Sequence, residues 1–205
     1  MTMKGLTEIA LVVDESGSMD KLKMPIVHGL NYILSRQKHE NGSATMTIVK
    51  FSDNLRYLTY NENVESILPF DDNNYFPMGN TLLLDGIGDT IDSIGCRLAD
   101  IEENGRPERV VVVIIADGED KLSKNYDYES IASKIELQRS KYSWEFILIA
   151  VGPLSIMEAR KLGIPKDRSY WVDATSEGVL KATEAINRAL TMVRNEGSIG
   201  ENWKF

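Results

Sequence analysis

The chain has 205 residues, a net charge of −8 and a single cysteine, Cys96. This length suits one α/β domain, which buries enough apolar surface to need no disulfide or structural metal. The surplus of acidic residues argues against binding to nucleic acid or to an anionic membrane, since both need a basic face on the protein.

Cellular location is inferred from the cysteine count and the apolar runs. One cysteine cannot form an internal disulfide, and a chain without disulfides favours a reducing compartment. The apolar run near the N-terminus is too short for the core of a signal peptide, and no run approaches the ~20 residues of a membrane span. We therefore expect a soluble, cytoplasmic protein.

The first part of the sequence predicts a strand, a helix and two further strands. Apolar residues at positions 9–13 form an unbroken run, which is typical of a strand buried on both faces. The expected elements are a strand at 7–13, an amphipathic helix at 21–37, strands at 45–51 and 55–60 that pair antiparallel across a short turn, an edge segment at 64–70 and a loop at 71–80.

The rest of the chain alternates helices with strands. The expected elements are a helix from Thr81 to about residue 94, a strand at 109–116, a helix at 128–142 with Ile131, Ile135 and Leu137 facing inward, a strand at 144–151, a helix at 155–162, a short strand at 170–172 and a closing helix at 176–193. The last residues, which include Trp203 and Phe205, are either loosely ordered or dock their aromatic rings.

This alternation predicts the fold class. Strands that alternate with helices form a doubly wound, Rossmann-like, mostly parallel sheet with helices on both faces, here with one antiparallel edge strand. Because no linker divides the sequence, we expect a single domain at residues 1–196, followed by a C-terminal tail at 197–205.

Polar side chains follow two of the expected buried strands. Asp14, Ser16 and Ser18 come after the first strand, and Asp117 follows the strand at 109–116. A carboxylate and two hydroxyls on alternate residues are hard oxygen donors, which suit a cation such as Mg²⁺. Simpler roles are open to the same residues, since Ser and Asp cap helices and Asp-Gly is a common turn. If the two strands are neighbours, their polar ends share one crevice.

Residues 14–18 read Asp-Glu-Ser-Gly-Ser and resemble the Asp-x-Ser-x-Ser motif of von Willebrand factor A domains, a family with a metal-ion-dependent adhesion site. Thr81 and Asp117 occupy the places of that family's remaining ligands, and the resemblance extends over residues 7–193. It implies a non-enzymatic domain that binds Mg²⁺, or Mn²⁺ or Ca²⁺, and captures an acidic side chain of a partner protein. The implied metal ligands are Asp14, Ser16, Ser18, Thr81 and Asp117.

Four further polar residues lie beside these ligands in the sequence, where they either shape the rim of the site or are solvated loop residues. We favour the second interpretation for each of them: Glu15, Asn80, Glu119 and Asp120.

Two other functions are compatible with the sequence. An acid at the end of a strand invites comparison with aspartate-nucleophile phosphatases, although these need a second acid where this chain has Ser16. Mg²⁺-dependent phosphoester hydrolysis or phosphoryl transfer is therefore one alternative. The other is a structural protein of the same fold with an idle metal site, which binds its partner through Trp203 and Phe205.

Overall fold

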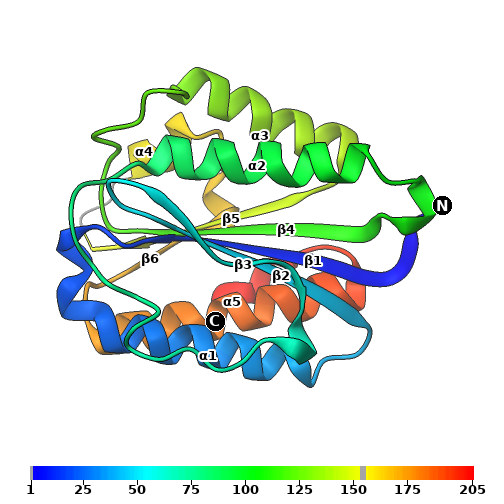
Figure 1. Ribbon diagram of the computed structural model, residues 1–205, viewed down its shortest axis with the longest axis horizontal. Helices are drawn as coiled ribbons and strands as arrows, with labels where there is room; N and C mark the ends of the chain where they lie inside the picture. The colour runs from blue at the N-terminus through cyan, green and yellow to red at the C-terminus, as the bar shows by residue number, and fades with distance from the viewer. Residues whose placement is uncertain (1, 153–155) are drawn as a thin grey trace.

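The computed structural model describes residues 2–152 and 156–205. They form a six-stranded sheet in the order β3-β2-β1-β4-β5-β6, in which β3 is antiparallel to β2 and the other neighbours are parallel (Figure 1). The expected fold class is confirmed, including the antiparallel edge strand. The strands are β1 Met3–Asp14, β2 Ser43–Phe51, β3 Leu55–Asn63, β4 Pro107–Ala116, β5 Glu145–Val151 and β6 Ser169–Val172.

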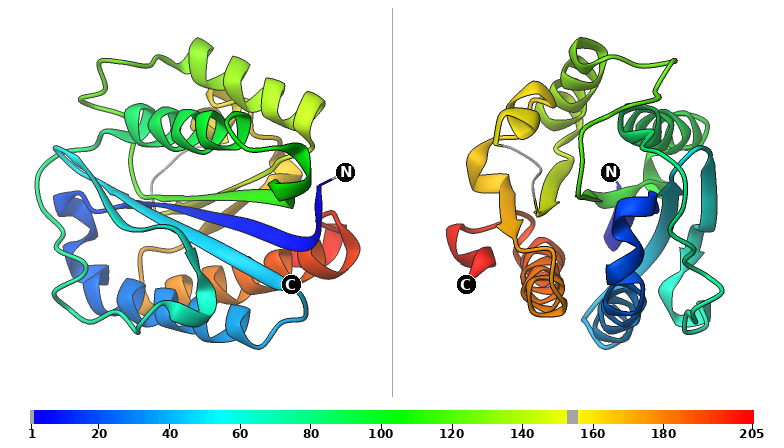
Figure 2. Two further views of the ribbon diagram at one scale, coloured as in Figure 1. Left: turned by 45° about the vertical axis from the view of Figure 1, so that its right-hand side comes forward. Right: turned by 90° about the vertical axis from the view of Figure 1, so that its left-hand side faces the viewer.

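Helices cover both faces of the sheet (Figure 2). Helices α1 (Lys23–Lys38) and α5 (Ser176–Glu196) lie on one face, and α2 (Leu83–Ala99), α3 (Tyr128–Tyr142) and α4 (Ile156–Lys161) lie on the other. Among residues 2–152 and 156–205, no helix is long and apolar enough to cross a membrane. The short 3-10 helices are η1 Gly17–Leu22, η2 Val64–Ser66, η3 Glu103–Gly105, η4 Lys166–Arg168 and η5 Glu201–Lys204.

Strands β1 and β4 lie side by side in the centre of the sheet. Alternate side chains of β1 enter opposite layers, so that Leu11 packs with the α1 and α5 side and Val12 with the α2 and α3 side. β1 pairs in parallel with β4, and Val13 lies opposite Ile115. Both strands therefore end at the same edge of the sheet, which brings the residues that follow them together.

The expected edge segment at 64–70 is wrong, because these residues pack against α1 instead of joining the sheet. The Asn31 side chain accepts the backbone N–H of Phe70 and donates to its carbonyl, each at 2.8 Å. Lys38 Nζ donates to the carbonyl of Ile67 at 2.7 Å. Side chains of α1 thus form hydrogen bonds with backbone groups that would otherwise pair with a neighbouring strand. The apolar side chains of Val64, Ile67 and Phe70 are buried.

Three smaller expectations need correction or qualification. α2 begins at Leu83, two residues after Thr81. Leu137 is half-exposed, since Ile131 and Ile135 are spaced for one face of α3 and a residue two positions further on points elsewhere. The expected helix at 155–162 begins outside the described residues, and its described part is α4.

The C-terminal tail, residues 197–205, docks on the domain. Gly197 ends α5 in the left-handed conformation, with φ of +87°. The Trp203 ring is fully buried, and its Nε1 donates to the carbonyl of Asp167 at 2.8 Å. Phe205 stays almost fully exposed. Of the two expectations for the tail, docking is therefore the one observed, although the boundary at residue 196 stays a prediction.

Candidate metal centre

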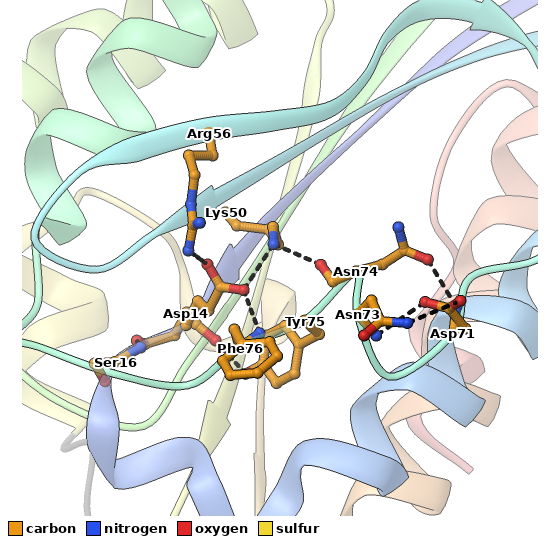
Figure 3. Close-up of polar contacts among 10 residues, drawn as sticks. Asp14, Ser16, Lys50, Arg56, Asp71, Asn73, Asn74, Tyr75 and Phe76 are labelled. Carbon is orange, nitrogen blue, oxygen red and sulfur yellow. Dashed lines mark hydrogen bonds and ion pairs between the residues drawn. The ribbon is translucent and has the colours of Figure 1, made fainter.

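Asp14 joins the ends of the two central strands. It is the last residue of β1, and its Oδ1 accepts the backbone N–H of Ser16 at 2.8 Å (Figure 3). Its Oδ2 lies 3.4 Å from the backbone nitrogen of Asp117, which directly follows β4. The carboxyl ends of the two strands therefore meet at one edge of the sheet, as expected, and they bring an aspartate from each strand together.

The two serine hydroxyls connect the aspartates. Ser16 Oγ lies 3.0 Å from Ser18 Oγ, and Ser18 Oγ donates to Asp117 Oδ1 at 2.9 Å. Ser18 lies inside η1, and the two hydroxyls bond to each other and to a carboxylate instead of capping that helix. Four of the five predicted ligands thus belong to one hydrogen-bonded group, in which backbone N–H groups link Asp14 to the other three residues.

Thr81 is held beside this group by its backbone. Its carbonyl accepts the N–H groups of Lys121 and Leu122 at 3.0 and 3.2 Å, which fastens the segment before α2 to the loop after β4. The residue is buried. These contacts place Thr81 next to the loop that carries Asp117, while the role of its hydroxyl as a ligand stays a prediction.

The electrostatics of the group favour a cation. Asp14 is fully buried, and desolvation raises the pKa of its carboxyl to about 6, with the charge of Asp117 as a smaller contribution in the same direction. Within the described part of the chain, no three His, Cys, Asp or Glu side chains gather as a metal site. A cation would have to be held by these two carboxylates and the hydroxyls, a donor set that fits a hard divalent ion.

Glu15 differs from the expectation of a solvated residue. It is buried, and its carboxylate contacts Lys50 Nζ at 2.7 Å and Arg56 Nη2 at 2.6 Å (Figure 3). It also accepts the backbone N–H of Phe76 at 2.5 Å. The signal in the sequence was Lys50, a charged residue near the end of a buried strand, because such a residue needs an acidic partner.

Asp120 also has a structural role that the sequence analysis missed. Its carboxylate accepts the backbone N–H of Leu84 at 3.1 Å and that of Ser123 at 3.2 Å, so it ties the loop after β4 to the first turn of α2. Asn80 is exposed and donates to Asp53 from its backbone and its side chain. Glu119 is exposed, as expected of a solvated residue.

Comparison of the sequence with models of protein families and with curated proteins found no match. Solved structures do match. Proximal thread matrix protein 1 from the mussel byssus superposes with a TM-score of 0.63 at 16% identity, over 91% of this chain and 46% of that one. A von Willebrand factor type A protein from Catenulispora acidiphila gives 0.62 at 13% identity, over 90% and 42%. The chain has the von Willebrand factor A fold.

The pilus adhesin SpaC from Lactobacillus rhamnosus GG has the same fold, with a TM-score of 0.68 at 11% identity over 90% of this chain and 30% of the adhesin. This chain thus spans less than half the length of these three proteins. One structure of the mussel protein has a zinc-occupied MIDAS motif, the adhesion-site motif that residues 14–18 resemble. The resemblance inferred from the sequence is confirmed at the level of the fold.

Proposed function

We propose that this domain binds a divalent cation at the carboxyl ends of β1 and β4 and uses it to capture an acidic side chain of a partner protein. The observation that carries the proposal is the connected group of Asp14, Ser16, Ser18 and Asp117, at the place where the fold ends its two central strands. Thr81 completes the proposed ligand set. We propose Mg²⁺ as the ion, with Mn²⁺ and Ca²⁺ as the chemically similar alternatives.

The donor set accounts for both parts of this function. Two aspartates roughly balance the charge of a divalent ion, and neutral hydroxyls supply further oxygen donors without adding negative charge. The bound cation would then attract a carboxylate from outside the domain. The zinc-occupied motif in the mussel protein supports metal binding at a site of this type.

We propose binding rather than catalysis. Ser16 and Ser18 bond to each other and to Asp117, an arrangement that serves a ligand group. Lys50, on β2, bonds to the Glu15 carboxylate and to the carbonyl of Asn74. These contacts engage its ammonium group within the fold, so it does not offer a free positive charge to a substrate phosphate. The absence of enzymatic activity and the cytoplasmic location stay predictions.

Water-proton relaxation with Mn²⁺ tests the proposal. Mn²⁺ bound to chelator-treated protein should enhance the relaxation rate of water through its exchangeable water ligands. Adding acetyl-aspartate amide should lower that enhancement as the carboxylate displaces water, and acetyl-asparagine amide should not. Equal responses to the two compounds would contradict capture of a carboxylate, and a relaxation rate equal to that of free Mn²⁺ would contradict the metal site itself.

A further inference from the structure

We infer that Phe76 and Met78 form an apolar rim beside the cation site and select partners whose acidic residue stands next to a large apolar one. This inference rests on the proposed function and specifies the kind of partner. The rim lies in the segment that leads from Tyr75 to Thr81.

Both rim side chains are exposed although they are large and apolar. Phe76 is 53% exposed and Met78 is 57% exposed. Their neighbour Tyr75 is completely buried, and its hydroxyl donates to the backbone carbonyl of Asp14. The same short segment thus buries one aromatic ring and leaves two apolar side chains more than half exposed.

The backbone of this segment is fastened to the loop that carries Ser16. The N–H of Phe76 donates to the Glu15 carboxylate, and the N–H of Met78 donates to the Glu15 backbone carbonyl at 2.9 Å. One step further, the N–H of Gly17 donates to the carbonyl of Gly79 at 3.1 Å. These bonds fall on both sides of Ser16, so the rim is held directly beside a proposed ligand.

Glu15 is the positioning residue of the rim. Lys50 Nζ bridges its carboxylate to the carbonyl of Asn74, and Arg56 holds the second carboxylate oxygen (Figure 3). Asn74 in turn closes a turn with Asp71, whose backbone N–H donates to Asn74 Oδ1 at 2.7 Å. The rim is therefore preorganised, and a ligand that contacts it would lose little conformational freedom of the protein.

The charge at the rim complements an acidic partner. Lys23 Nζ lies 4.1 Å from the centre of the Phe76 ring, a cation–π contact that places positive charge on this side of the site. A cation held by Asp14 and Asp117 would add to it. The surface thus combines apolar side chains with positive charge, which matches a protein segment in which Asp or Glu adjoins a residue such as Leu.

Three blocked tetrapeptides test this inference: Gly-Leu-Asp-Gly, Gly-Ser-Asp-Gly and Gly-Leu-Asn-Gly, each titrated into ¹⁵N-labelled protein with saturating Mg²⁺ and followed by chemical-shift changes. We expect the Leu-Asp peptide to bind roughly tenfold more tightly than the Ser-Asp peptide, from burial of the leucine side chain. In the variant Phe76→Ser/Met78→Ser this preference should fall to within about twofold, with the affinity for Mg²⁺ and for the Ser-Asp peptide unchanged.

Leu137→Ser is the matched control. The exposed fraction of Leu137, 50%, is similar to that of the two rim residues. Leu137 lies near the end of α3 that leads into the start of β5, and therefore far from the carboxyl ends of the strands that carry the proposed site. This variant should keep the full preference for the Leu-Asp peptide.

The possible failures are distinguishable. Equal, metal-dependent binding of the Leu-Asp and Ser-Asp peptides would overturn the rim and leave the proposed function intact. A preference that persists in Phe76→Ser/Met78→Ser would also overturn the assignment to these residues. If the Leu-Asn peptide binds as tightly as the Leu-Asp peptide, or if neither Asp peptide binds to Mg²⁺-loaded protein, carboxylate capture fails and the inference fails with it.

Discussion

The substitution Glu15→Gln should destabilise the protein strongly, because it leaves the ammonium of Lys50 buried without its carboxylate partner. Lys50 is 4% exposed, and desolvation already lowers its pKa while Glu15 opposes that shift. Removing one member of a buried ion pair costs about 3–5 kcal/mol. The second partner, Arg56, has a side chain that is 50% exposed, so its contact with Glu15 adds little to this cost.

Urea denaturation followed by circular dichroism measures this loss as a lower midpoint at an unchanged slope. For a chain of this size the midpoint of thermal unfolding should fall by roughly 10 °C. The double variant Glu15→Gln/Lys50→Met should recover most of the loss, since it removes the stranded charge as well. Glu177→Gln breaks the exposed pair with Lys181 and should leave the midpoint unchanged. A loss in Glu15→Gln no larger than in Glu177→Gln would refute the reasoning.

Three further predictions concern the site and the tail. Burial raises the pKa of Asp14 to about 6, so Mg²⁺ affinity measured by calorimetry should decline as pH falls from 7.5 to 5 and protons compete with the ion; a constant affinity would exclude Asp14 as a ligand. For the same reason Asp14→Asn should stabilise the metal-free protein at pH 7.5 by up to about 3 kcal/mol in urea, and a destabilised variant would show that the buried charge is not costly. Trp203→Ala should lower stability by about 3–5 kcal/mol, and an unchanged urea midpoint would show that the docked tail contributes nothing.

Local sequence pattern was enough to predict the central part of the fold. The unbroken apolar runs of β1 and β4 identify strands buried on both faces, and the short connection after Phe51 predicts the antiparallel pairing of β2 with β3. The pattern fails at residues 64–70, where the backbone bonds to Asn31 and Lys38. Partners supplied by a distant helix leave no trace in the local alternation of polar and apolar residues.

The site shows the same division between local and long-range information. The spacing of Asp14, Ser16 and Ser18 and the aspartate after β4 can be read from short motifs, because the chain order sets which residues end which strand. Glu15 was missed because its role depends on strand register: Asp14 lies opposite Phe51, which brings Glu15 to the end of β2 beside Lys50. Only the paired sheet shows that this acid faces inward.

Isothermal titration of Mg²⁺ and Mn²⁺ into chelator-treated protein tests the proposed metal centre most directly. Asp14→Asn and Thr81→Ala are measured beside the wild-type chain, and Glu119→Gln, at an exposed neighbour of the site, is the control. We expect saturable binding of one ion in the wild type and in Glu119→Gln, and loss of this binding in both site variants. If Asp14→Asn and Thr81→Ala bind the ion as tightly as the wild-type chain does, a metal centre built from these loops is contradicted.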